Sequence, residues 1–352
     1  MQKLNQADKS NQDSTHPTIL NMEKFQKIFT NFLPELNLIE NIILEFAVGK
    51  SPLIHEVTKH LISSGGKRIR PILLILASKL CGSESDNKNV LGLAAAIELI
   101  HSATLLHDDV VDASMMRRGR KTSNAIWDNK ASILVGDYLF SIAFQLMVLS
   151  KNFDVLALLS KTSSIMSDGE VMQLQNSNNI TLSESDYFNI IFGKTAALFS
   201  AACEVGALIN NRSQQEITAL NNFGKNLGII FQITDDILDY SSDEKTFGKE
   251  KGGDFFEGKV TLPIILTYEK SSDAEKKMIS EIFLKNNFSD EKNQKEFDSV
   301  FDLIKKYDGL ETSKNMALLY KTHALENLKI FPDSQKKDDL LTILEYSLAR
   351  IS

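Results

Sequence analysis

The chain has 352 residues, 43% of them hydrophobic, and carries a net charge of −7 from 39 basic and 46 acidic side chains. This composition supports a large hydrophobic core and excludes global disorder, and the acidic balance argues against a general nucleic-acid-binding protein. Only Cys81 and Cys203 are present, which excludes a disulfide framework and a cysteine-based zinc site.

Residues 1–22 are polar and rich in Asn, Gln and Ser. They lack the apolar run of a secretory signal and the arginines of a transit peptide, so we predict a disordered tail here and one domain over 23–352. The longest apolar stretch, 190–209, is interrupted by Lys194 and Glu204. Because a membrane span needs about 18 uncharged apolar residues, we expect no span and a cytoplasmic protein.

Long helical patterns follow, separated by few prolines and glycines, and strand-like alternation is scarce. The segment 90–112 is apolar on nearly every face, which indicates a buried helix. Residues 270–315 are charged around short apolar spots and predict shorter surface helices joined by polar loops. The fold class is therefore all-α, one large bundle, with helices predicted over 23–48, 52–63, 70–80, 90–112, 131–149, 153–175, 184–210 and 214–240.

An acidic motif lies at the end of the buried helix, in LLHDDVVDASMMRRGR (105–120). Asp108 and Asp112 share a helix face, whereas Asp109 lies about 100° round. Two carboxylates on one face repel each other unless a cation lies between them, and oxygen-only ligands suit Mg²⁺. One such motif is weak evidence, because solvated acidic faces are common.

The same spacing returns in FQITDDILDY (231–240), at Asp235, Asp236 and Asp239. Two copies, each at the end of an apolar helix, are difficult to explain as solvated surface. If the two helices face each other, their aspartates can hold several Mg²⁺ ions around one polyphosphate group.

Basic residues surround these motifs. The segment SSGGKRIRP (63–71) places two glycines before Lys67, Arg68 and Arg70, a combination suited to binding phosphate, although a solvated helix start fits equally well. His101 lies two turns before Asp108 on nearly the same face, although an isolated histidine in an apolar helix is more often a core residue. Arg117 and Arg118 follow the first motif.

Two further segments carry lysines. Lys194 stands in an apolar helix, where an ammonium group is costly unless it meets an anion or reaches solvent. The segment FGKEKGGDFFEGKVTLP carries Lys249, Asp254 and Lys259 just after the second acidic motif. By itself it is a flexible charged loop, but beside a metal motif it can close over a diphosphate.

The motifs GGKRIRP, HSATLLHDDVVDASMMRRG, GKTA, FQITDDILD and EGKVTLP, in this order from about residue 40 onward, resemble the trans-type polyprenyl diphosphate synthases. The first motif is similar to that of long-chain bacterial members that make quinone side chains. The resemblance implies a helical bundle around a deep central cavity, the isoprenoid synthase fold. It also implies Mg²⁺-dependent condensation of an allylic diphosphate, farnesyl or similar, with successive isopentenyl diphosphates, with three Mg²⁺ ions per active site and a homodimer.

The same resemblance implies a role for each matching residue. Metal ligands would be Asp108, Asp112, Asp235 and Asp239, with Asp109 and Asp236 in support. Isopentenyl diphosphate would bind Lys67, Arg70, His101 and Arg118, and the allylic diphosphate Arg117, Lys194, Lys249 and Lys259. Lys194, Thr195 and Gln232 would be catalytic, with Gln232, the Thr195 hydroxyl and nearby carbonyls facing the allylic cation. Gln173 would line the same region, and Arg68 would point elsewhere.

The resemblance implies that product length is limited by the residues at Ala103 and Thr104, where two small side chains leave room for a long product. Helix geometry supports Thr104, on the face of Asp108, whereas Ala103 rests on the resemblance alone. A deeper floor could involve Phe140, Phe144 and Met147, although plain core packing is the preferred interpretation. One departure is Gly253, where many relatives carry Asp.

Three other functions are considered. A non-catalytic or partner-dependent subunit of a heteromeric synthase is the main alternative, although such subunits tend to lose acidic motifs. The His107–Asp108 step is also typical of metal phosphohydrolases, but that interpretation leaves the second motif unexplained. Terpene cyclases share the fold but do not need the bases of the isopentenyl site.

Overall fold

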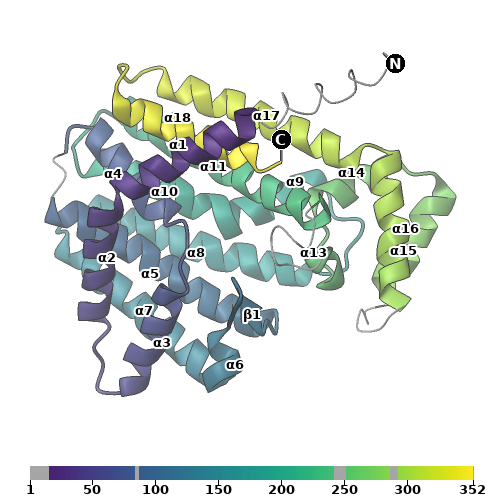
Figure 1. The fold of residues 1–352 in the computed structure, drawn as a ribbon, viewed down its shortest axis with the longest axis horizontal. Helices are drawn as coiled ribbons and strands as arrows, with labels where there is room; N and C mark the ends of the chain where they lie inside the picture. Colours follow the sequence, from purple (N-terminus) through teal and green to yellow (C-terminus); the bar gives the residue numbers. More distant parts are fainter. Residues whose placement is uncertain (1–15, 84–86, 242–250, 286–291, 352) are drawn as a thin grey trace, which may run out of the picture.

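A computed structural model describes residues 16–83, 87–241, 251–285 and 292–351. Almost all of its regular structure is helical, as predicted (Figure 1). The first half contains α1 (His16–Asn31), α2 (Leu33–Phe46), α3 (Pro52–Ser63), α4 (Ile69–Leu80), α5 (Lys88–Val111), α6 (Ser123–Trp127), α7 (Asn129–Leu149) and α8 (Phe153–Gln175). The second half contains α9 (Glu184–Ile191), α10 (Ala197–Leu208), α11 (Gln214–Ser241), α13 (Gly253–Phe256), α14 (Leu262–Lys270), α15 (Asp273–Leu284), α16 (Lys292–Lys306), α17 (Gly309–Leu328) and α18 (Gln335–Ala349).

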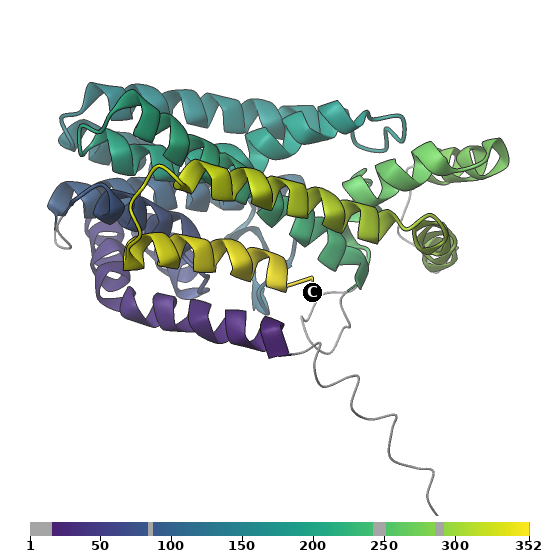
Figure 2. The same cartoon turned by 90° about the horizontal axis from the view of Figure 1, so that it is seen from above.

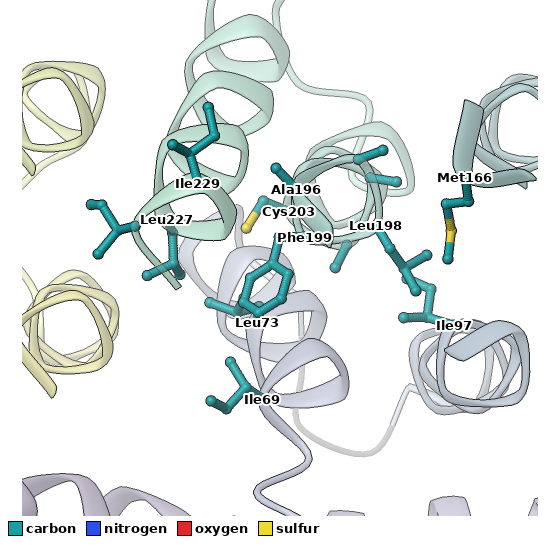
Figure 3. Close-up of a cluster of buried hydrophobic side chains, with 14 of the residues drawn as sticks. Ile69, Leu73, Ile97, Met166, Ala196, Leu198, Phe199, Cys203, Leu227 and Ile229 are labelled. Carbon is teal, nitrogen blue, oxygen red and sulfur yellow. The ribbon is translucent and has the colours of Figure 1, made fainter. Parts of the chain in front are cut away.

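The centre of the bundle is built from the most apolar helices. Helix α10 packs against α4, α8 and α11, and α5 packs against α4 and α7. Figure 3 shows side chains of these helices meeting in the core, among them Leu73, Ile97, Met166, Phe199 and Leu227. On one side, α18 lies between α17 and α1, so the C-terminal helix covers the bundle (Figure 2).

The N-terminal region corrects two expectations. Helix α1 begins at His16, so residues 16–22 are helical instead of part of a tail, and 1–15 lie outside the described residues. The helix expected over 23–48 is two helices, α1 and α2, which meet at Phe32. Pro34 stands in the first turn of α2, where proline is tolerated; inside one long helix it would remove a hydrogen bond and clash with the preceding turn.

The helix expected over 184–210 is also interrupted. Between α9 and α10 the backbone forms a π-helical turn, η1 (Phe192–Ala196), which contains Lys194 and Thr195. At this turn α8 comes very close, since a Cβ added to Gly193 would lie 2.8 Å from the Cα of Gly169. Such turns are frequent at functional sites, and this one lifts Lys194 out of the regular helix.

A short hairpin that was not expected orients the two arginines after the first acidic motif. Strands β1 (Met116–Arg117) and β2 (Arg120–Lys121) pair antiparallel, with a two-residue turn at Arg118 and Gly119. Both turn residues have positive φ, 52° and 75°, which suits the twist of a tight hairpin. The turn therefore directs Arg118 back toward the glycines after α3.

By length and composition, α5, α7 and the segment Glu184–Leu208 could each cross a membrane, whereas the sequence analysis expected no such stretch. In α5 and Glu184–Leu208, 72% and 83% of the most apolar window is buried inside the protein, so packing explains their composition. In α7 the buried share is 44%.

Candidate active site

The two acidic motifs belong to one site. The first ends α5, with Asp112 as its C-terminal cap, and the second lies in the last turns of α11. Lys259, which follows α13, places its Nζ 3.2 Å from Oδ2 of Asp112 and also contacts Glu257. A cation from the segment after the second motif therefore bridges to the first motif.

The inner aspartate of each motif is buried and already bound by protein. Asp109, 2% exposed, accepts from Arg117, with nitrogens at 2.8 and 2.9 Å from Oδ1. Asp236, also 2% exposed, accepts from the Tyr187 hydroxyl at 2.6 Å and from Gln232 Nε2 at 2.8 Å. These contacts agree with the expected supporting roles.

The outer aspartates Asp108, Asp112, Asp235 and Asp239 are half-buried. Burial, together with repulsion from Glu170, raises the pKa of Asp108 to about 7. Burial disfavours the ionised form of Asp108, and the carboxylates of Glu170 and Asp112 add to this effect, whereas Lys194 and Arg117 act against it. Carboxylate oxygens are hard donors, which fit Mg²⁺.

Among the described residues, no three His, Cys, Asp or Glu side chains stand close enough to enclose a metal by themselves. Mg²⁺ is usually held by one or two carboxylates and completed by water and substrate phosphates, and each outer aspartate can supply one such carboxylate.

Two outer aspartates of the second motif have partners that sequence reasoning missed. Arg350, at the end of α18, lies 2.6 Å from Oδ1 of Asp235 and stacks over the ring of Phe231. Asp239 accepts from the backbone N–H of Asp254 at 3.1 Å, which ties α13 to the motif. The contact with Arg350 joins segments far apart in sequence, and no local sequence pattern indicates it.

The residues expected to bind isopentenyl diphosphate form a separate basic cluster. Arg70 is buried over the ring of Phe199, its Nε has no hydrogen-bond partner, and burial lowers its pKa to about 10. Lys67 is an exposed residue, but its ammonium group is partly buried. This burial, followed by repulsion from Arg350, lowers the pKa of Lys67 to about 8. Arg118 donates to the Gly65 carbonyl.

His101 lies within the same cluster. Burial, followed by repulsion from Arg70 and Arg118, lowers its pKa well below the usual value, so it is neutral at pH 7. Cations that repel one another at close range favour an anion among them. Arg68, in contrast, pairs with Glu98 and Glu40, as expected for a residue pointing elsewhere.

The π-helical turn and α11 form the wall between the two charged regions. Lys194 pairs with Glu170 at 3.1 Å, and the Thr195 hydroxyl donates to Gln232 Oε1 at 2.7 Å. A small cavity here is lined by Gln173, Lys194, Gln232, Asp236, Asp254 and Lys259, among others. Glu170 was missed, although it precedes Gln173 by one helical turn. Lys249 lies outside the described residues.

Ala103 and Thr104, the residues expected to limit product length, are both on α5. Ala103 is completely buried, and Thr104 is half-buried with its hydroxyl donating to the His101 carbonyl at 2.8 Å. Met147 on α7 is also completely buried, and the rings of Phe140 and Phe144 pack against the core 5.6 Å apart. Core packing accounts for these three residues, as preferred.

The His107 side chain turns away from the aspartates of the first acidic motif. Its Nε2 lies 3.2 Å from the carbonyl of Ile133 and 3.5 Å from Asp137, so the imidazole joins α5 to α7. This contact removes the reason for considering a metal phosphohydrolase.

The family model described as Polyprenyl synthetase matches residues 51–301. The chain belongs to this family. It is 33% identical over 332 residues to the octaprenyl diphosphate synthase of Haemophilus influenzae, which covers 94% of this chain and 98% of the relative. Polyprenyl synthetases are prenyltransferases that generally depend on Mg²⁺, and the acidic motifs described above fit that requirement.

Solved structures of polyprenyl synthetases share the fold. A decaprenyl diphosphate synthase from Rhodobacter capsulatus has a TM-score of 0.87 and 38% identity, covering 93% of this chain and 99% of that one. A polyprenyl synthase from Caulobacter crescentus, complexed with calcium and isoprenyl diphosphate, has a TM-score of 0.86 and 35% identity, covering 93% and 98%. The all-α isoprenoid synthase fold expected from the sequence is confirmed.

Proposed function

We propose that this protein is a long-chain trans-polyprenyl diphosphate synthase that extends farnesyl diphosphate, or a similar primer, with successive isopentenyl diphosphates. The observation that carries the proposal is the pairing of two different anion sites. One combines carboxylates with Lys259 at the ends of α5 and α11, and the other is the basic cluster around Arg70. The reaction needs two diphosphates that bind differently, because only the allylic one ionises.

The charged residues at the two anion sites determine which diphosphate each site would bind. Arg117, Lys194 and Lys259 would hold the allylic diphosphate, and Lys249 would join them from its loop. Lys67, Arg70, His101 and Arg118 would hold isopentenyl diphosphate. Because the second site consists of three cationic side chains and a neutral histidine, its diphosphate would be bound by these side chains.

In the chemical step the allylic carbon–oxygen bond breaks and its electron pair leaves with the diphosphate. The double bond of isopentenyl diphosphate then attacks the allylic carbon, and a proton is lost to the departing diphosphate. Asp108, Asp112, Asp235 and Asp239 would hold Mg²⁺, expected as three ions per site, which would supply positive charge to the leaving diphosphate. The oxygens of Thr195 and Gln232 would stabilise the allylic cation, and Lys194 would act in the same step through its positive charge beside the departing diphosphate.

A long product is supported by the small side chains at Ala103 and Thr104, and by relatives whose names specify octaprenyl and decaprenyl products. Such a chain would serve as a quinone side chain. The protein would act as a cytoplasmic homodimer.

The test is incubation of purified protein with Mg²⁺, farnesyl diphosphate and labelled isopentenyl diphosphate, followed by chromatography of the dephosphorylated chains. The proposal expects chains of about eight to ten isoprene units. Products that stop at three or four units would contradict the long-chain assignment. A folded protein that gains activity only with a partner would favour the subunit alternative.

A further inference from the structure

A buried tyrosine outside the motifs considered so far reaches the active site. Tyr187 on α9 is 3% exposed, and its hydroxyl donates to Oδ2 of Asp236 at 2.6 Å. A hydroxyl placed in the core needs a partner, and here the partner is the inner carboxylate of the second acidic motif. Tyr187 thereby ties α9 to α11.

This hydrogen bond is the first of three in a row. Oδ1 of Asp236 accepts from Nε2 of Gln232 at 2.8 Å, and Oε1 of Gln232 accepts from the Thr195 hydroxyl at 2.7 Å. Gln232 and Asp236 are one helical turn apart on α11, whereas Thr195 stands on the π-helical turn. This row of hydrogen bonds therefore joins α9, α11 and the π-helical turn, and it ends at Thr195, the residue after Lys194.

The order of donors and acceptors along this chain has a consequence. An isolated amide can rotate by 180° and exchange its oxygen and nitrogen. Oδ1 of Asp236 accepts from Nε2 of Gln232, which keeps the amide nitrogen on the side of Asp236 and turns the amide oxygen toward Thr195. The single hydroxyl proton of Thr195 is used in this hydrogen bond, so the lone pairs of its oxygen are available to a positive charge.

We propose that Tyr187 is a positioning residue for the prenyl transfer, which holds Asp236 so that the Gln232 and Thr195 oxygens keep their orientation toward the allylic cation. Asp236 has an oxygen for each neighbour, so removing the tyrosine hydroxyl allows the carboxylate to rotate. The inference rests on the proposed function. It adds that the inner aspartate of this motif acts through hydrogen bonds and not as a metal ligand.

The first test is Tyr187→Phe, which removes the hydroxyl and keeps the ring. Single-turnover condensation of farnesyl and isopentenyl diphosphates should slow by about 10- to 100-fold, as expected for a misplaced catalytic group. The KM of each diphosphate and the Mg²⁺ requirement should stay within about twofold, because the residues that grip diphosphate are unchanged. A change confined to KM or to Mg²⁺ dependence would overturn the proposal.

The matched control is Tyr320→Phe. Tyr320 on α17 belongs to the same aromatic group, with its ring 5.4 Å from that of Phe188, which in turn contacts Tyr187. Neither oxygen of Asp236 bonds to Tyr320, because Tyr187 and Gln232 take them. The control should therefore react at the wild-type rate, and an equal loss in both variants would indicate disturbed packing.

A double-mutant cycle separates positioning from a structural role. If Tyr187 acts only through Gln232, adding Tyr187→Phe to Gln232→Ala should slow the reaction by less than about twofold further. Multiplication of the two single effects would overturn the proposal.

A second variant covers the case in which Tyr187→Phe does not fold. In Asp236→Asn one oxygen remains, so it can accept from Tyr187 or from Gln232 but not from both. The same loss of single-turnover rate at unchanged Mg²⁺ dependence is expected, and a raised Mg²⁺ requirement would instead make Asp236 a metal ligand.

A crystal structure of the variant that folds gives a readout independent of activity. The Gln232 amide should be rotated or disordered there, and an unchanged Gln232–Thr195 contact would contradict the positioning role. If wild-type protein does not elongate farnesyl diphosphate, the proposed function fails, while this structural result still tests the role of Tyr187.

Discussion

In each acidic motif, the surroundings of the inner and outer aspartates differ. Asp109 and Asp236 are buried with protein donors, whereas Asp108 and Asp235 are half-buried, and Asp235 meets Arg350. Helix geometry predicts that the inner residue points away from the outer ones, about 100° from the aspartate before it and about 60° from the one three residues later. The partners of the inner residues are distant in sequence, and only the structure reveals them.

Replacing Asp108 should raise the stability of the protein and lower its activity. Because its pKa is raised to about 7, the folded protein binds this proton more tightly than the unfolded chain does. The free energy of unfolding therefore falls as the pH rises from about 4 to about 7, and the ionised group remains destabilising above that range. At pH 8 without Mg²⁺, Asp108→Asn should have a higher Tm than wild type and a turnover lower by about 100-fold or more.

The control for that experiment is Asp109→Asn, which weakens a buried pair with Arg117 and should lower the Tm. A lower Tm for Asp108→Asn with full turnover would contradict both the destabilising effect of the ionised Asp108 and its metal role.

The lowered pKa of Lys67 predicts an upper pH limit for the use of isopentenyl diphosphate. With its pKa lowered to about 8, the ammonium form is complete below that pH and is lost above it. The kcat/KM for isopentenyl diphosphate reports the free enzyme and should therefore fall as the pH rises through about 8. Lys67→Arg keeps its charge and should move the fall to higher pH; an identical profile in this variant would show that another group sets the limit.

At the scale of elements, the bounds of α3 and α8 agree with the sequence prediction, since both have clear stop signals at each end. The π-helical turn was not predictable, because FGKTA has no local feature that distinguishes it from an α-helix. It arises from tertiary packing, where Gly169 and Gly193 let two backbones approach. Likewise Glu170, Tyr187 and Arg350 reach the site from helices whose packing the sequence does not specify.

Gly193→Ala should disturb this turn. The added methyl group would meet the Gly169 Cα at 2.8 Å and the Ile165 carbonyl oxygen at 2.9 Å, both of them backbone atoms that cannot move independently. We expect a loss of about 1–3 kcal/mol in the free energy of unfolding, with turnover reduced through displacement of Lys194. Thermal unfolding measures the first effect. Gly92→Ala, with open space around its Cβ, is the control, and equal stability of the two variants would contradict the packing argument.

At the scale of the whole molecule, α7 is the apolar helix that the bundle covers least. Leu134, Val148 and Leu149 are 68%, 59% and 56% exposed along it, which is unusual for large apolar side chains on one helix. A second copy of the chain would cover this surface in the homodimer that the family resemblance implies. Sequence reasoning could not locate the interface, because α7 has the same apolar character as the buried helices.

Leu134→Glu should therefore shift the protein from dimer to monomer, because it would bury a charge at the interface. Light scattering after size-exclusion chromatography measures the mass. Leu319→Glu on α17 changes a leucine that is 50% exposed and should leave the dimer intact. A wild-type monomer, or a dimer that survives Leu134→Glu, would contradict the assignment of this surface.

The central claim is that the two acidic motifs face each other across one diphosphate. The most direct measurement is a crystal structure with Mg²⁺ and a non-cleavable farnesyl diphosphate analogue. We predict metal ions between the diphosphate and the outer aspartates of both motifs, with Lys259 moved from Asp112 to a diphosphate oxygen. A diphosphate bound away from Asp108 and Asp235, or metal at only one motif, would contradict the account.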